Sequence, residues 1–146
     1  MAEPIDQDEE VKILLPGTLP LAPVLPEGVT AVGYMPRAPI PVQHRDAEAI
    51  VLWGGSGRWQ AEAAQDLPHL RWVQTLSAGS EVTEGAGFVP GAVITSGLGL
   101  HDVTVAEHAL ALILAAARRL DTAVRAVDEH RWAKELSINQ PLDNAT

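Results

Sequence analysis

Five short apolar runs, each followed closely by glycine or proline, constrain the fold of this 146-residue chain more than any other feature. Runs of this length with such stops are typical of buried strands rather than helices. Because they are apolar throughout and do not alternate with polar residues, they indicate a parallel sheet covered on both faces. The five strands are expected within residues 11–16, 29–35, 49–53, 70–79 and 91–97.

The segments between these runs indicate how the strands are connected. Three prolines in TLPLAPVLPEG, residues 18–28, disfavour a full helix after the first run, because proline breaks the helical hydrogen-bond pattern. PRAPIPVQ, residues 36–43, reads as a loop, and the polar segment at about 58–66 reads as a helix. This order of elements predicts an α/β fold, a flavodoxin-like, doubly wound parallel five-stranded sheet followed by two C-terminal helices.

The last forty residues follow a helical pattern. Residues 102–120 contain no glycine or proline, which predicts one helix with Asp102 at its cap or as its first residue. Its apolar run ALALILAAA, residues 109–117, is about half as long as a membrane span and is expected to be buried. A second helix is expected to begin at the cap Asp121. Its apolar face is predicted at Val124, Val127 and Trp132.

Composition and charge exclude several classes of protein. A hydrophobic content of 47% rules out a disordered chain, and the lack of cysteine excludes disulfides, thiolate metal sites and a cysteine nucleophile. The start MAEPIDQDEE holds five acids and no base, unlike a secretory signal, so a cytoplasmic location is expected. The net charge of −9 leaves about −4 outside that tail, which makes nucleic acid and anionic membranes poor partners.

The stretch SGLGLHD, residues 96–102, looks like a dinucleotide-binding turn. Ligands of doubly wound sheets bind beyond the carboxyl ends of strands, where this stretch lies. The phosphate-binding fingerprint needs a third glycine and an acidic residue about twenty positions on, after a second strand. Here Asp102 stands at the third glycine position, and Asp121 lies in helical sequence with no strand before it. The stretch is therefore interpreted as a strand-to-helix loop of another kind of domain.

Several motifs together resemble a known family. LRWVQTLSAG, a strand ending in SGLG, the helix HDVTVAEHALALILAAARRL and a following helix ending near HRW are similar to the N-terminal region of D-isomer-specific 2-hydroxyacid dehydrogenases. The similarity covers about residues 68–134, and residues 11–67 agree in their order of elements. In that family a flavodoxin-like substrate-binding domain precedes an NAD(P)-binding Rossmann domain. The resemblance implies an oxidoreductase that transfers hydride from a D-2-hydroxy acid to NAD or NADP.

This resemblance assigns a role to each part of the chain. Residues 136–146 correspond to the loop before the family's cofactor domain, which is expected to be missing, so that the fragment alone is expected to be inactive. The expected parts are an acidic disordered tail at 1–10, a substrate-binding domain at 11–101, inter-domain and dimerisation helices at 102–135, and a loop toward the cofactor domain at 136–146.

The family's substrate contacts map onto two loops of small residues. Its members bind the substrate carboxylate through backbone N–H groups after the fourth strand, and small side chains leave such groups accessible to an anion. The loop after the third strand lines the substrate. The substrate-binding residues implied in this way are Trp53, Gly54, Gly55, Ser77, Ala78, Gly79 and Ser80.

The rest of the family pattern is only partly present. Leu100 and Val105 correspond to residues that approach the nicotinamide, whereas the catalytic Arg, Glu and His of the family lie in the later domain, so no catalytic residue is expected here. The family usually continues the carboxylate loop with an apolar residue and then Asp or Asn. This chain has Ser80 and Glu81 instead, which places a negative charge near an anion site.

For several other polar and aromatic residues, a binding role is weighed against a structural or surface role. His101, Glu107 and His108 lack the spacing of a zinc-binding helix, so no metal site is expected. His101 either lines the cleft or is a solvated loop residue, and Arg37 and Arg58 either meet an acidic substrate or carry surface charge. The tryptophans are expected mainly in packing roles. Trp53 and Trp132 are the two for which a binding role is also considered.

The sequence leaves two alternatives to an oxidoreductase domain open. One is a non-catalytic, stand-alone module that binds a small anion or another subunit. Another is an unrelated flavodoxin-like domain, although a receiver would need acidic residues at its strand ends, which the first three runs lack. A homodimer through helices 103–134 is expected, because their apolar side chains have no partner within the predicted sheet domain. The family resemblance also implies dimer formation through this region.

Overall fold

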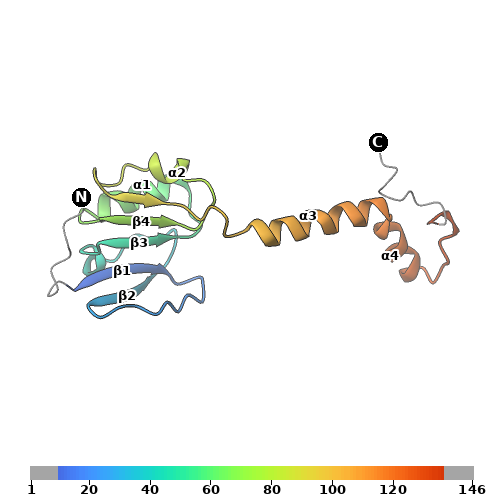
Figure 1. Cartoon of the computed structure of the whole chain (residues 1–146), viewed down its shortest axis with the longest axis horizontal. Coiled ribbons are helices and arrows are strands. Elements are labelled where there is room, and N and C mark those ends of the chain that lie inside the picture. Colours follow the sequence, from blue (N-terminus) through green and yellow to red (C-terminus); the bar gives the residue numbers. More distant parts are fainter. Residues whose placement is uncertain (1–9, 137–146) are drawn as a thin grey trace. The chain divides into compact units, whose positions relative to one another are not determined.

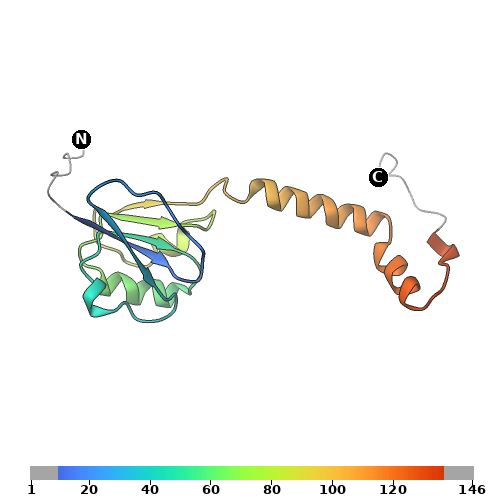
Figure 2. The ribbon, with the colours of Figure 1, turned by 90° about the horizontal axis from the view of Figure 1, so that it is seen from below.

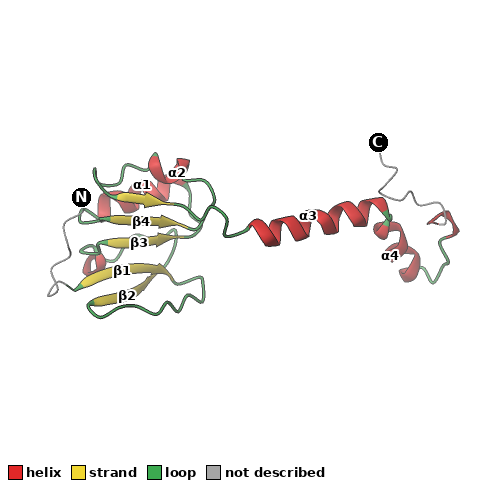
Figure 3. Ribbon diagram, in the orientation of Figure 1, coloured by secondary structure: helices red, strands yellow, loops and turns green. Residues whose placement is uncertain are grey.

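The computed structural model describes residues 10–136. The predicted acidic tail, except Glu10, and the predicted terminal loop, except Leu136, lie outside the described residues. The chain divides into two compact units, Met1–Leu100 and His101–Thr146. The first contains every strand, and the second contains the long helix (Figures 1 and 3). Each unit is described by itself below.

The first unit is built on a five-stranded, all-parallel sheet (Figure 3). Its strand order is β2-β1-β3-β4-β5, so the predicted flavodoxin-like fold is confirmed. Every expected strand is present, although β4 and β5 are shorter than their apolar runs. The strands are β1 (Val11–Pro16), β2 (Val29–Tyr34), β3 (Ala49–Leu52), β4 (Trp72–Thr75) and β5 (Val93–Thr95).

The hydrophobic core lies between the sheet and α1 (Gly57–Asp66), which Figure 2 shows along one face of the sheet. Alternate residues of the strands point to this face, so Leu14, Ile50 and Val73 are fully buried. Trp59 of α1 packs into the same cluster. Burial of these side chains provides the main stabilisation of the sheet, at about 1.5–3 kcal/mol for each large apolar residue.

The connections between strands agree with the sequence in part. The proline-containing segment after β1 is not helical, as expected, and α1 closely matches its predicted range. Ser56 caps α1, with its Oγ accepting a hydrogen bond from the Trp59 amide at 3.3 Å. Two short helices were not predicted, η1 (Val42–His44) and α2 (Glu81–Glu84), because a single turn has too few residues to show a helical period.

The second unit contains α3 (Asp102–Ala117), α4 (Leu120–Asp128) and η2 (Lys134–Leu136). Asp102 is the first residue of α3, one of its two predicted positions, and Asp121 is not the cap of α4. His101 and Arg119 occupy the N-cap positions, and neither makes a side-chain capping bond. The break between the helices falls at Arg119, whose left-handed φ of 49° ends the helical path without a glycine. The second helix was expected to begin at the cap Asp121, which lies two residues after this break.

The C-terminal side of α4 also differs from the prediction. The helix ends at Asp128, and Trp132 lies beyond it rather than on its apolar face. The amide of Arg131 donates to the Ala126 carbonyl at 2.8 Å, next to His130 with a φ of 50°. This reversal closes the helix end with a left-handed residue, as glycine usually does.

Helix α3 is apolar yet exposed. None of its residues is buried, so the prediction that ALALILAAA is a buried run is wrong for the described residues. Leu110 and Ile113 remain 59% and 52% exposed. Among the described elements of its own unit, the nine-residue α4 is the main neighbour of α3. No helix in the described part of the chain has the length and apolar character needed to cross a membrane.

Gly97 allows the loop after β5 to lie against the end of β4. A Cβ atom at Gly97 would lie 2.5 Å from the carbonyl oxygen of Leu76 and 2.8 Å from its carbonyl carbon, both of which are backbone atoms. We therefore expect Gly97→Ala to lower the free energy of unfolding by about 1–3 kcal/mol. The measurement is urea denaturation followed by tryptophan fluorescence.

Gly33→Ala is the matched control for this prediction. Gly33 lies in the exposed edge strand β2, and a Cβ there would have no atom within 4 Å. We expect this change to leave stability unchanged or to raise it by about 0.5–1 kcal/mol, because alanine restricts the unfolded chain. Equal destabilisation by both variants would contradict the role assigned to Gly97.

Candidate functional site

Three loops meet at the carboxyl edge of the sheet, following β3, β4 and β5. The last residues of β3 and β4 pair in register, and the amide of Leu76 donates to the Leu52 carbonyl at 3.0 Å. The amide of Gly97 donates to the Ser77 carbonyl at 2.8 Å. These backbone bonds hold the loops side by side, so the predicted residues at 53–55 and 77–80 share one edge of the sheet.

The loop after β4 presents consecutive backbone amides. The Ser77 amide is already satisfied, since it donates to Thr75 Oγ1 at 3.2 Å. For the amides of Ala78, Gly79 and Ser80, no acceptor is found among the described residues. Successive N–H groups in a small-residue turn form an anion-binding concavity. The geometry thus favours Ala78, Gly79 and Ser80 over Ser77 as donors to a carboxylate.

Glu81 places a carboxylate next to this loop. A Cβ atom built on Gly79 would lie 2.3 Å from Glu81 Oε2, so the acidic side chain lies over the glycine. Glu81 is the first residue of α2. Ser80, the residue before it, donates from its Oγ to Oε1 of Glu84, the last residue of α2, at 2.6 Å. An incoming anion would therefore meet the charge of Glu81 as well as the open amides.

The loop after β3 depends on its two glycines. Gly54 and Gly55 have φ values of 68° and 85°, a region in which residues with side chains are strained. A Cβ at Gly55 would also lie 2.8 Å from Cε3 of Trp59. Trp53, just before them, is 37% exposed. The backbone here can therefore approach a ligand closely, as the sequence suggested.

Aromatic packing between Tyr34 and Trp59 supports the loop after β3. The rings of Tyr34 and Trp59 stack with centroids 5.7 Å apart and an interplanar angle of 4°. Tyr34 Oη donates to the Val51 carbonyl at 3.0 Å, and burial raises the pKa of this phenol well above its ordinary value. The hydroxyl therefore remains a donor at any physiological pH, and the stack ties β2, β3 and α1 together.

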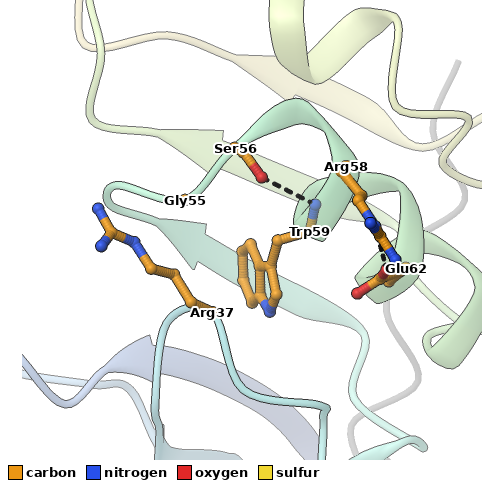
Figure 4. A pocket seen from close by; sticks show the side chains of 6 residues that line it. All are labelled: Arg37, Gly55, Ser56, Arg58, Trp59 and Glu62. Carbon is orange, nitrogen blue, oxygen red and sulfur yellow. Dashed lines mark hydrogen bonds and ion pairs between the residues drawn. The ribbon is translucent and has the colours of Figure 1, made fainter.

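A cavity of about 400 Å³ opens beside this aromatic pair, as Figure 4 shows. Arg37 and Arg58, the two arginines considered for an acidic substrate in the sequence, both line this cavity. Glu62 was missed by sequence reasoning, although its position four residues after Arg58 on a helix was an available signal. The lining residues are Arg37, Gly55, Ser56, Arg58, Trp59 and Glu62.

The two predicted nicotinamide contacts belong to different units. Leu100 lies in the turn after β5, where its amide donates to the Gly97 carbonyl at 3.0 Å, and its side chain is 61% exposed. Val105 is on α3 and is 62% exposed. Leu100 belongs to the same unit as the loops of the sheet. In the described part of the chain, no three His, Cys, Asp or Glu residues gather as a metal site would require.

Comparisons with known proteins give one consistent result. No protein-family model matches the chain. Over 100 residues the chain is 33% identical to D-3-phosphoglycerate dehydrogenase of Archaeoglobus fulgidus, which covers 68% of this chain and 19% of that protein. This chain thus spans about a fifth of that curated relative.

Two solved structures have a similar fold. One is a D-isomer specific 2-hydroxyacid dehydrogenase family protein from Aeromonas salmonicida, with a TM-score of 0.66 and 14% identity over 92% of this chain and 44% of that one. The other is D-lactate dehydrogenase from Aquifex aeolicus, complexed with NAD and lactic acid, with a TM-score of 0.60 and 17% identity. That match covers 90% of this chain and 41% of the other.

Together the fold and the comparisons make this chain an α/β domain related to oxidoreductases. The resemblance to D-isomer-specific 2-hydroxyacid dehydrogenases, inferred from the motifs, is confirmed. The similarity extends over less than half the length of each of these relatives, so the activity of a whole enzyme is a matter of proposal.

Replacing Glu81 tests the anion-binding property of the loop after β4. We expect Glu81→Gln to strengthen binding of a small carboxylate, because it removes a negative charge beside Gly79 and retains the side-chain shape. An increase in affinity of roughly threefold to tenfold is expected for one nearby charge at the surface. The measurement is a titration with oxamate followed by the amide resonances of Ala78 and Gly79.

Glu27→Gln serves as the control for this titration. It makes the same change of charge just before β2, at the amino end of the strands and away from the loop. If both variants alter the affinity equally, long-range charge rather than the position of Glu81 explains the effect.

Proposed function

We propose that this chain is the substrate-binding domain of an NAD(P)-dependent oxidoreductase that acts on D-2-hydroxy acids. The observation that carries the proposal is the turn after β4, where the amides of Ala78, Gly79 and Ser80 are open at the carboxyl edge of the sheet. A substrate carboxylate fits this turn, since successive N–H groups bind anions without a positively charged side chain. The neighbouring Gly54 leaves room for the rest of a small substrate, since a Cβ atom there would have no atom within 4 Å.

The nicotinamide is the second ligand of the proposed enzyme. Leu100 fits a role against its ring, because the side chain is apolar, exposed and next to Gly97 at the site's edge. Val105 is assigned the same role by resemblance alone. When bound, the nicotinamide accepts the hydride from the carbon that bears the hydroxyl. The residues of this chain bind and orient the acid.

The chain is proposed to bind substrate without turning it over. The family's catalytic Arg, Glu and His correspond to a later part of the enzyme, and we assign no catalytic residue to this sequence. The lack of cysteine favours a cytoplasmic setting for such an enzyme.

Titration with pyruvate, combined with an activity assay, tests this proposal. We expect millimolar binding that shifts the amides of Ala78, Gly79 and Ser80, because a single carboxylate makes only a few charge-assisted bonds. NADH mixed with the chain and pyruvate should not be oxidised. The proposal is wrong if the amides of this loop do not respond, and the assignment of no catalytic residue is wrong if NADH is consumed.

We further propose that the chain forms a homodimer through residues 103–134. The support is the set of exposed apolar side chains on α3 and α4, since contiguous exposed apolar patches mark interaction sites. Light scattering should give twice the chain mass of 15.5 kDa.

Charged substitutions on α3 test the proposed dimer. Leu110 and Ile113 lie three residues apart on one side of the helix, so Leu110→Asp with Ile113→Asp should give a monomer that is still folded. Val24→Asp is the control, since Val24 is fully exposed in the loop after β1. A wild-type monomer at micromolar concentration would refute the dimer.

A further inference from the structure

The cavity beside Trp59 has an electrostatic character that the carboxylate-binding turn does not explain. Two guanidinium groups and one carboxylate line it, so its wall is net positive in a chain whose overall charge is −9. We propose that this cavity binds a second anionic group, a carboxylate or a phosphate, at the far end of the 2-hydroxy or 2-oxo acid. The inference rests on the proposed function, which supplies the binding of the first carboxylate.

Arg37 is the guanidinium that is open to this ligand. Arg58 is paired with Glu62, with Nε to Oε1 at 3.0 Å, whereas Arg37 makes no ion pair or hydrogen bond within residues 10–136. Figure 4 shows Arg37 and the Arg58–Glu62 pair on opposite sides of the Trp59 ring. A free guanidinium at the mouth of a cavity can bind carboxylate or phosphate with two parallel hydrogen bonds.

The backbone that carries Arg37 is held in place by Trp59. The indole Nε1 donates to the carbonyl of Ala38, the next residue, at 2.8 Å. The amide of Trp59 is in turn capped by Ser56 Oγ, so the loop after β2 and the start of α1 are fixed to each other. The loop that carries Arg37 is thus held against the start of α1, and the exposed Arg37 side chain lines the same cavity as Gly55 and Ser56.

The two sites lie on neighbouring loops of the sheet, which suits one ligand with an acidic group at each end. The cavity borders Gly55, in the loop after β3, and the open amides follow the neighbouring strand β4. A dicarboxylic acid or a phosphorylated hydroxy acid has acidic groups at both ends of one small molecule.

Titrations of the 146-residue chain with three acids test the inference. Pyruvate carries one anionic group, 2-oxoglutarate adds a distal carboxylate, and D-3-phosphoglycerate adds a distal phosphate. We expect at least one of the two larger acids to bind roughly tenfold more tightly than pyruvate, as one charge-assisted contact supplies. The tighter of the two identifies the distal group as carboxylate or phosphate. Equal affinity for all three acids would overturn the inference.

Three variants locate the effect. Arg37→Met should remove the tenfold advantage and leave pyruvate binding unchanged, and Glu62→Gln should increase the advantage by freeing Arg58. Arg71→Met is the matched control, because it removes the same charge just before β4, where Arg71 pairs with Glu48. An advantage that survives in Arg37→Met would also overturn the inference.

The outcomes separate this inference from the proposed function. If pyruvate does not shift the amides at 78–80, the proposed function is wrong and the inference falls with it. If pyruvate shifts them but Arg37→Met retains the preference for the larger acids, only the inference is wrong. Inorganic phosphate provides an independent readout, since it should shift the amides of Gly55 and Ser56 in the wild-type chain and not in Arg37→Met.

Discussion

The parallel pairing of β3 with β4 is the constraint on which the candidate site depends. Because both strands run in the same direction and pair to their last residues, the loops after them start side by side. The amide of Leu76 continues the pairing one residue beyond the strands, and Gly97 extends it to the loop after β5. Residues more than twenty positions apart therefore meet at one edge without any long side chain to join them.

The sequence predicted the sheet well and the helical region less well. Apolar runs closed by glycine or proline located all five strands, because runs of this length with such stops are typical of strands. The break between the two helices was located by the cap residue Asp121 to within two residues. The reversal at His130 had no such signature, since a residue other than glycine adopts the left-handed backbone there.

The candidate site was predictable at the level of loops but not of individual groups. Small residues marked the turns at 53–55 and 77–80. The engagement of the Ser77 amide by Thr75, and the position of the Glu81 carboxylate over Gly79, depend on side-chain geometry that spacing does not encode. Likewise, the hydrogen bond from Trp59 Nε1 to the Ala38 carbonyl, which holds the loop of Arg37 beside α1, is not encoded in residue spacing.

The charge of the chain adds a constraint on how an anion could reach this edge. With a net charge of −9, the protein as a whole repels anions, but that repulsion is screened beyond about 8 Å at physiological ionic strength. Close to the surface, the open amides and Arg37 attract an anion while Glu62 and Glu81 oppose them. The choice among acids therefore depends on local geometry. An acid that reaches both the amides and Arg37 gains two attractive contacts. An acid that reaches only the amides gains one, which the charge of Glu81 opposes.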